Sequence, residues 1–211
     1  MIFLKRVLSK KGGLEKYSYY LAKAYQKLGL KVSFCYQEGS GFEGFTDNIC
    51  LPSSFSLFNY QKIQDFDKQT KHSTAFGPKD LLFGLDRNSH QHIYRAGNGV
   101  HAYYLDQRKE KASFLKRLSL DLNPLHKSLL QIEKQGFTNP ELKHLITNSY
   151  FVKKQVLDYY DVDESKVKVI HNGVQWAGYQ QAFDESFDLE KTSLGFLPDV
   201  PLILFAGNGW E

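Results

Sequence analysis

Residues 2–37 read IFLKRVLSKKGGLEKYSYYLAKAYQKLGLKVSFCYQ, and this stretch decides the fold. Its first part, residues 2–8, is a short apolar run typical of a buried strand, and a polar segment with two adjacent glycines follows it. Apolar residues then recur every three or four positions up to Gly29, which predicts a helix with a glycine cap. Residues 31–37 are a second strand-like run. A strand, turn, helix and strand in this order predict a βαβ unit with parallel strands.

The same alternation continues along the chain. A helix is predicted over 149–160, with Ser149 as its N-cap. Further strand-and-turn segments are predicted at 80–86, 92–97, 144–149 and 166–173. The polar residues 66–80 are interpreted as a loop, and 102–136 as helical with a break at Pro124. Repeated alternation of this kind predicts an α/β fold, a Rossmann-like, doubly wound parallel sheet.

Composition indicates a globular protein with one main domain. The chain has 211 residues, 42% of them hydrophobic, and a formal charge of +4. After Gly173 the alternation of strands and helices gives way to a segment that resembles a linker with a short helix, followed by a new apolar run. We therefore expect a domain over 1–174, a linker region over 175–201 and the first strand of a second domain over 202–211. The two cysteines have no metal-ligand spacing and make no disulfide framework, and no apolar run is long enough to span a membrane. These features predict a reduced, cytoplasmic protein.

The positive charge is concentrated in one segment, RKEKASFLKR, residues 108–117. Its basic residues, opposed by Glu110 alone, are Arg108, Lys109, Lys111, Lys116 and Arg117. Aromatic and apolar neighbours flank them, which is the mixture that an anionic membrane surface attracts. A solvated helix face is the alternative. Nucleic acid is not expected as a partner, because the patch is short and no recognition module accompanies it.

The glycine turn lies on the edge of the sheet where ligands bind. In a parallel sheet this is the edge formed by the carboxyl ends of the strands. Gly12 and Gly13 permit unusual backbone angles and remove side chains that would block a phosphate from the first amides of the helix. A tight turn without a ligand is the alternative, because the pair is neither a P-loop nor a complete dinucleotide fingerprint.

Other polar residues follow strands at the same predicted edge. Asp86 and Arg87 end one strand, and Arg95 and His101 bracket the next turn. They are candidates for ligand contact, while an ion pair between loops and a hydrogen-bonded turn histidine are the alternatives. A metal site at His90 and its neighbour two residues on is not expected, because no third ligand is evident. The tyrosines of the first helix are interpreted as packing residues rather than a stacking platform.

Several segments together resemble one family, the family-four retaining glycosyltransferases of GT-B fold, in particular the lipopolysaccharide core glucosyltransferase I type. The segments that carry the resemblance are 12–32, 85–105, 146–174 and 202–211, and the most specific of them contain YRAGNGVH and VIHNGV. Their order matches the amino-terminal half of such enzymes plus the first strand of the other half. The glutamate-bearing donor motif and the basic residue expected after GNGWE are missing, so the resemblance implies an incomplete nucleotide pocket.

The resemblance implies two Rossmann-like domains, with the acceptor held mainly by the first and a nucleotide-diphosphate sugar by the second, without a metal or other cofactor. Gly12 and Gly13 then correspond to the loop that faces the donor diphosphate. Glu15, Arg87 and Arg95 are implied acceptor-binding residues. Asn172, which most simply makes a turn with the following glycine, is implied to frame the interdomain cleft.

Asn98 departs from the family pattern, in which an aspartate is common at this position. An asparagine positions a ligand through hydrogen bonds but cannot act as a base. If Asn98 is natural, the role of base moves to His101 or Asp86, or to the phosphate of the donor. If it was engineered, it silences the site.

The resemblance also implies a partner and a location. Residues 102–136 correspond to a region that contributes to acceptor binding and to contact with the inner membrane, so the basic segment is expected to meet lipopolysaccharide core, another glycolipid or anionic headgroups. Such a protein is peripheral on the cytoplasmic side of the inner membrane. A face left uncovered by an absent second domain is expected to favour self-association.

Two function classes remain from the sequence. The first is the amino-terminal fragment of a glycosyltransferase, inactive alone, which when whole transfers a hexose with retention to a glycolipid acceptor. The second is a non-catalytic module that binds an anionic glycolipid or a membrane surface. A dinucleotide-dependent oxidoreductase ranks third, because its full glycine fingerprint is absent.

Overall fold

The computed structural model describes residues 1–9, 12–45, 47–53, 56–174, 176, 191–197 and 200–203. It divides the chain into two compact units, Met1–His171 and Asn172–Glu211. The predicted linker, 175–201, is described only in part, and residues 204–211 of the predicted second-domain strand lie outside the described residues. The predicted domain boundaries therefore stay predictions.

The first unit is built on a seven-stranded sheet in which every recorded pairing is parallel. The strand order is β5-β3-β1-β6-β7-β8-β9. The strand bounds are β1 Ile2–Leu4, β3 Ser33–Tyr36, β5 Ile49–Cys50, β6 Leu82–Gly84, β7 Ile93–Arg95, β8 His144–Thr147 and β9 Val167–Val169. The predicted α/β, Rossmann-like parallel sheet is confirmed.

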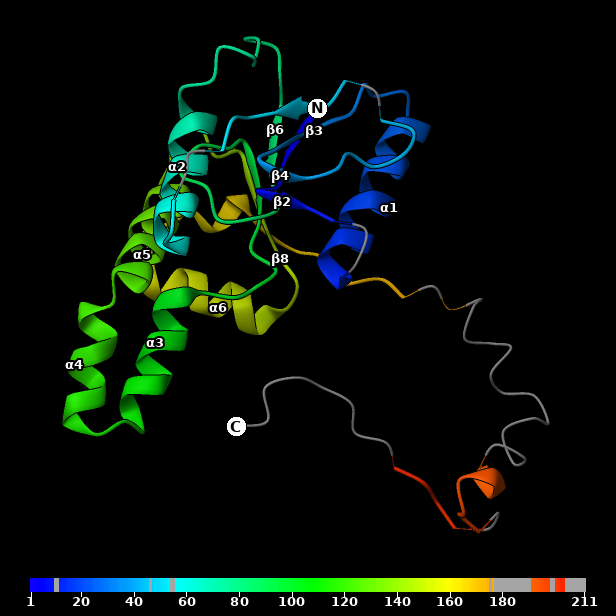
Figure 1. Cartoon of the computed structure of the whole chain (residues 1–211), viewed down its shortest axis with the longest axis vertical. Coiled ribbons are helices and arrows are strands. Elements are labelled where there is room, and N and C mark those ends of the chain that lie inside the picture. Colours follow the sequence, from blue (N-terminus) through cyan, green and yellow to red (C-terminus); the bar gives the residue numbers. More distant parts are fainter. Residues whose placement is uncertain are drawn as a thin grey trace. The chain divides into compact units, whose positions relative to one another are not determined.

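Helices cover both faces of this sheet (Figure 1). The bounds are α1 Gly13–Lys27, α2 Asn59–Lys71, α3 His101–Glu110, α4 Phe114–Leu122, α5 Pro124–Phe137 and α6 Tyr150–Tyr159, with a short 3-10 helix η1 at Glu164–Lys166. Alternation along β1 explains the two layers. Phe3 packs in the cluster under α1, whereas Ile2 and Leu4 pack with Phe66 of α2 on the opposite face.

The first predicted βαβ unit is present with one change. β1 pairs with β3 in parallel, and α1 ends in a Schellman motif in which Gly29, at φ +81°, donates to the carbonyl of Gln26. The single strand predicted over 2–8 is wrong. After β1 the chain leaves the sheet, because the amide of Arg6 donates to the carboxylate of Asp86, and β2 (Val7–Leu8) pairs separately with β4 (Glu38–Gly39).

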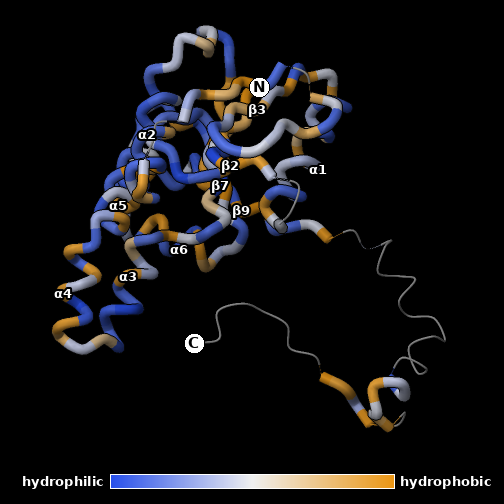
Figure 2. Tube along the Cα trace, in the orientation of Figure 1, coloured by the Kyte–Doolittle hydropathy of each residue, from blue (hydrophilic) through white to orange (hydrophobic). Residues whose placement is uncertain are grey.

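The helices show where sequence patterns were informative. Ser149 caps α6 by accepting from the amide of Val152, and Pro124 opens α5 at its first turn, so both predictions are confirmed. The loop predicted over 66–80 is wrong in its first part, because α2 continues to Lys71. Figure 2 shows α2 as a mostly hydrophilic tube. Even its buried face includes two polar residues, Asp67 and Thr70.

Candidate functional site

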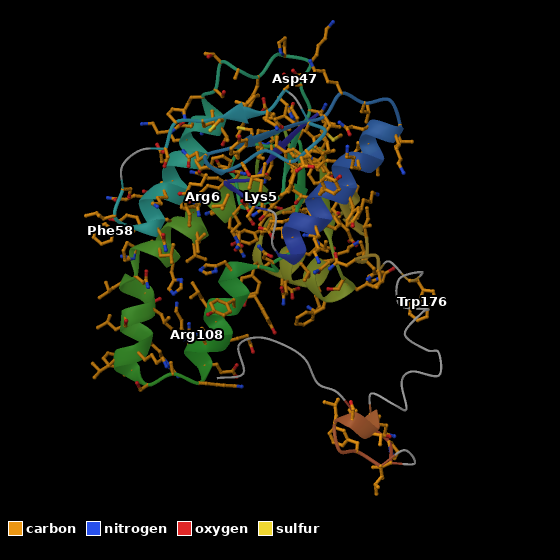
Figure 3. The ribbon with its side chains drawn as sticks, turned by 45° about the vertical axis from the view of Figure 1, so that its right-hand side comes forward. Lys5, Arg6, Asp47, Phe58, Arg108 and Trp176 are labelled. Atoms are coloured by element: carbon orange, nitrogen blue, oxygen red, sulfur yellow. The ribbon has the colours of Figure 1, made fainter. Side chains whose placement is uncertain are left out.

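The candidate site lies at the carboxyl ends of the parallel strands. Lys5 follows β1, Asp86 follows β6, the loop 97–99 follows β7, and α1 begins in the turn beyond β2. Figure 3 labels Lys5 and Arg6 next to each other, and it labels Arg108, which belongs to α3. Strand order alone thus gathers the predicted edge residues of distant sequence segments.

The glycine turn gives its two glycines different tasks. Gly12 is the N-cap of α1 and has φ +117°, a conformation closed to residues with a Cβ. A Cβ there would also clash with the carboxylate of Glu15 as it is placed. A Cβ on Gly13 would meet nothing within 4 Å. The first glycine is therefore required by the backbone, and the second leaves open space beside the first turn of the helix.

Three charged side chains form an ion-pair cluster beside this turn. The ammonium of Lys5 lies 3.1 Å from a carboxylate oxygen of Asp86 and 3.6 Å from Oε1 of Glu15. Lys5 is buried, and Asp86 also accepts from the amide of Arg6 over 2.9 Å. The cluster fixes the end of β1 to the end of β6 and to α1. It also places a carboxylate, that of Glu15, beside the turn predicted to receive a phosphate.

Arg87 belongs to a buried network centred on Glu133 of α5. Its Nε donates to Glu133 over 2.9 Å, and its Nη2 donates to the carbonyl of Gly99 over 3.1 Å. The Glu133 carboxylate also accepts from the amides of His101 and Ala102, the first two residues of α3. A negative charge at this helix N-terminus stabilises the partial positive charge there.

Tyr160 completes the network by donating to Glu133 over 2.7 Å. Burial, and then this hydrogen bond, raise the pKa of the Tyr160 phenol above its ordinary value. The phenol is therefore protonated and remains a donor throughout the ordinary pH range. The network holds α3, α5 and the loop 97–99 in one fixed arrangement.

His101 opens α3 and pairs with a histidine of α5. Its Nε2 lies 3.1 Å from Nδ1 of His126, so one of the two rings donates to the other. Burial, and then the positive charge of Arg87, lower the pKa of His101 to about 4. His101 is therefore neutral at pH 7 and only a weak base, which disfavours it as a proton acceptor from a sugar hydroxyl.

The loop after β7 carries the other predicted candidates. Asn98 is exposed at this loop, next to Gly99, whose φ is +70°. Arg95 is buried instead, with its guanidinium 4.0 Å from the ring centroid of Tyr17. Its side chain lies over Gly97, where a Cβ would clash with the guanidinium. The geometry makes Arg95 a support for the loop.

The remaining predicted residues lie away from this cluster or in the other unit. Asn172 begins the second unit, so its predicted place in a cleft stays a prediction. His90 pairs with Glu141 at 3.2 Å, and Nδ1 of His92 accepts from the amide of Leu82. Over the described part of the chain no group of three or more His, Cys, Asp or Glu side chains is arranged to hold a metal ion.

The predicted basic segment forms a helical arm made of α3 and α4, here called the α3–α4 arm, residues 101–122. The turn between its helices is held by Arg117, which donates to the carbonyls of Ala112 and Glu110. Lys109 pairs with Asp121, which lies outside the basic segment 108–117 and was therefore not counted among its charges. Large exposed hydrophobic side chains accompany the charges, namely Tyr104, Phe114, Leu115, Leu118 and Leu122. Figure 2 shows hydrophobic and hydrophilic segments alternating along α4.

Sequence reasoning missed the partners that organise the site. Glu133 and His126 lie in the segment predicted only as helical, and Lys5 lies inside a predicted strand. The signal that could have found Glu133 is a carboxylate on the same helix face as the buried Ile132 and Phe137, where an acid needs a partner, but the sequence analysis did not assign faces to this helix. No helix among the described residues is long and apolar enough to cross a membrane.

Comparisons with known proteins relate the chain to glycosyltransferases. A family model described as Glycosyltransferase Family 4 matches residues 77–175. No curated protein matches the chain at a significant level. Among solved structures, "WaaG, a glycosyltransferase involved in lipopolysaccharide biosynthesis" is similar at a TM-score of 0.74 and 16% sequence identity.

The WaaG match covers 92% of this chain and 51% of that structure, so the chain spans about half the length of the protein it resembles. The matched family segment contains Arg87, the loop 97–99, the buried Glu133 and the α3–α4 arm. Residues 77–175 are thus similar to Glycosyltransferase Family 4, and the chain has an α/β, Rossmann-like fold that matches about half of a GT-B glycosyltransferase.

Proposed function

We propose that the chain is the acceptor-side half of a glycosyltransferase. When whole, the enzyme transfers a hexose, with retention of configuration, from a nucleotide-diphosphate sugar to lipopolysaccharide core or another glycolipid. The observation that carries this proposal is the family match over residues 77–175, because that segment supplies one side of the carboxyl edge. The likeness to WaaG supports the fold and the choice of a lipopolysaccharide-related acceptor.

The proposed roles follow from the contacts. Gly13 leaves space for the donor diphosphate beside the amides that open α1, and Asn98 orients an acceptor hydroxyl from the exposed loop. Arg87 acts through Gly99, whose carbonyl it holds, and thereby positions that loop. Glu15 borders the same edge and contributes to acceptor binding, whereas Arg95, which is buried against Tyr17, contributes only by supporting the loop 97–99.

Few side chains of this half can act as the general base that accepts the proton of the acceptor hydroxyl. The carboxylate of Asp86 already accepts from Lys5 and Arg6, and His101 is a weak base. Asn98 cannot be a base. These facts favour a front-face displacement in which the acceptor oxygen bonds to the anomeric carbon, the bond to the diphosphate breaks, and a phosphate oxygen takes the proton. No metal or other cofactor is required for this step.

The α3–α4 arm is proposed to bind the cytoplasmic surface of the inner membrane. Its exposed Phe114 and Leu115 lie between the basic residues at the end of α3 and those of α4. An apolar tip with basic flanks suits an anionic lipid surface. This feature alone also favours the second candidate function, a non-catalytic module that binds anionic glycolipid or membrane.

The test is a titration of the purified 211-residue chain at two salt concentrations. One arm uses a panel of nucleotide diphosphates, and the other uses lipopolysaccharide core or anionic vesicles. The proposal expects salt-sensitive binding of core and weak nucleotide binding. Tight nucleotide binding by this chain alone would overturn the assignment of the halves, and sugar transfer by the chain alone would overturn its expected inactivity.

A further inference from the structure

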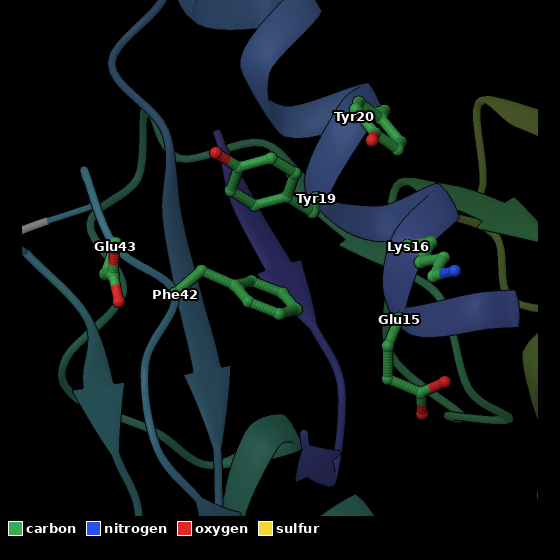
Figure 4. A pocket seen from close by; sticks show the side chains of 6 residues that line it. All are labelled: Glu15, Lys16, Tyr19, Tyr20, Phe42 and Glu43. Atoms are coloured by element: carbon green, nitrogen blue, oxygen red, sulfur yellow. The ribbon is translucent and has the colours of Figure 1, made fainter. Parts of the chain in front are cut away.

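A pocket of about 240 Å³ opens beside the glycine turn, on the side of α1 that faces the segment after β4 (Figure 4). Two carboxylates, one ammonium and three aromatic rings line it, namely Glu15, Lys16, Tyr19, Tyr20, Phe42 and Glu43. Because the first turn of α1 begins at the carboxyl edge, the pocket adjoins the candidate site and shares Glu15 with it.

The aromatic wall is preformed. The ring of Tyr19 meets the rings of Phe42 and Tyr20 edge to face, at centroid distances of 5.6 Å in both cases. Phe42 is buried, and Tyr19 also packs on Phe45, so the wall rests on the core under α1. Tyr20, by contrast, is 52% exposed. An exposed tyrosine beside a fixed aromatic wall offers a ligand both a flat apolar face and a hydroxyl.

The polar side chains restrict what the pocket accepts. Glu15 and Glu43 place two carboxylates, which are acceptors only, in the lining, while Lys16 is a donor only, and the ammonium of Lys23 lies 5.8 Å from the ring centroid of Tyr19. Paired hydroxyl groups can donate to carboxylates, whereas a phosphate would meet like charge. The volume is below the roughly 300–1,000 Å³ of pockets for drug-sized ligands, which limits the occupant to about one ring.

We propose that this pocket is a subsite for one neutral, unphosphorylated sugar ring of the acceptor. This inference rests on the proposed function, and it reverses the interpretation of Tyr19 and Tyr20 as packing residues alone. The aromatic wall stacks on the apolar face of the ring, and the carboxylates of Glu15 and Glu43 accept from its hydroxyls. A phosphate on the acceptor is therefore held elsewhere than in this pocket.

The test measures sugar binding to the 211-residue chain by ligand-observed NMR, with methyl α-D-glucopyranoside as the neutral probe and glucose 6-phosphate as the anionic one. The proposal expects the neutral probe to bind more tightly. Tyr20→Ala should weaken its binding about tenfold, and Tyr20→Phe, which keeps the ring, should weaken it less. Glu43→Gln should weaken the neutral probe and strengthen the phosphate.

A matched control is Glu164→Gln on η1, outside the pocket, which should change neither affinity. Preference for glucose 6-phosphate, or a Tyr20→Ala variant that folds and binds the neutral probe unchanged, would overturn the subsite. These outcomes are separate from the proposed function. If the neutral probe binds in this pocket but the complete enzyme transfers no sugar, the proposed function is refuted and the subsite stands. If the complete enzyme transfers sugar but the neutral probe does not bind in this pocket, the subsite is refuted and the proposed function stands.

Discussion

The guanidinium of Arg87 donates to the carboxylate of Glu133 over 2.9 Å, although the two residues lie in different elements, one after β6 and the other in α5. Glu133 is 1% exposed. A charge so deeply buried is tolerated only with compensating partners, and here the amide of His101 and the hydroxyl of Tyr160 supply the others. This pair is the support on which the loop 97–99 rests.

Removal of one member of the pair should strongly destabilise the domain. We expect Glu133→Gln to lower the free energy of unfolding by about 3–5 kcal/mol, because it leaves Arg87 buried without a counter-charge. Denaturant unfolding of the purified chain measures this. The double variant Arg87→Met with Glu133→Gln removes both charges and keeps an oxygen that accepts from the amide of His101 and the hydroxyl of Tyr160, so it should recover part of the loss. Equal instability of the single and double variants would contradict the account.

The two adjacent glycines should respond differently to alanine. Gly12→Ala should cost about 1–3 kcal/mol of stability, because its φ of +117° is reserved for glycine. Gly13→Ala should leave stability unchanged or raise it by about 0.5–1 kcal/mol, since it lies in the helix and its Cβ meets nothing. Its added methyl should instead weaken ligand binding at the carboxyl edge. Thermal unfolding and a core-binding titration separate the effects, and loss of stability in Gly13→Ala would refute the distinction.

His101 should make the domain sensitive to acid. Its folded-state pKa of about 4 lies below the ordinary value of 6.5, so the folded state favours the neutral ring. This contribution is present above pH 6.5 and is lost as the pH falls from 6.5 towards 4. The neighbouring His126, whose pKa is lowered chiefly by burial, acts in the same direction.

The measurement is the difference in stability between the wild-type chain and His101→Asn across this pH window, because other groups titrate as well. Burial raises the pKa of Asp67, which opposes the histidines in an undifferenced profile. The wild-type chain should lose more stability than the variant between pH 6.5 and 4. Parallel profiles would show that His101 is not the titrating group.

The α3–α4 arm should bind anionic vesicles through both its charge and its apolar tip. Lys111→Ala and Lys116→Ala should each cost about 1 kcal/mol of binding, about fivefold in affinity, with a smaller effect at high salt. Leu115→Ser should weaken binding at every salt concentration. Lys27→Ala, an exposed lysine at the end of α1, is the control. Equal losses of vesicle affinity in all four variants, the Lys27→Ala control included, would show that binding does not depend on the arm and would contradict the prediction.

The sequence predicted the parallel sheet well because its strands and α1 have strong local patterns. The cap at Gly29 and the helix break at Pro124 depend on a few adjacent residues, and both were found. Helix α2 was missed because its buried face includes Asp67, whose partner Ser89 is distant in sequence. Local patterns do not reveal such pairing.

The candidate site could be predicted as an edge but not as a set of contacts. Strand order brings Asp86 and Arg87 to the edge, as expected, but Asp86 is held by Lys5 and Arg87 by Glu133. Those partners depend on how the helices and strands pack together, and the spacing of residues along the sequence does not reveal this packing. The pocket beside Tyr20 likewise depends on the packing of the segment after β4 against α1.

The most direct test of the central claim is an amide NMR titration of the labelled 211-residue chain with delipidated lipopolysaccharide core oligosaccharide. The account predicts that the resolved glycine signals of Gly13, Gly97 and Gly99 shift together, because the acceptor binds at the carboxyl edge, while the amides of the α3–α4 arm move little without lipid. Shifts confined to the arm, with the three glycines unchanged, would contradict the claim and favour a non-catalytic anionic binding module.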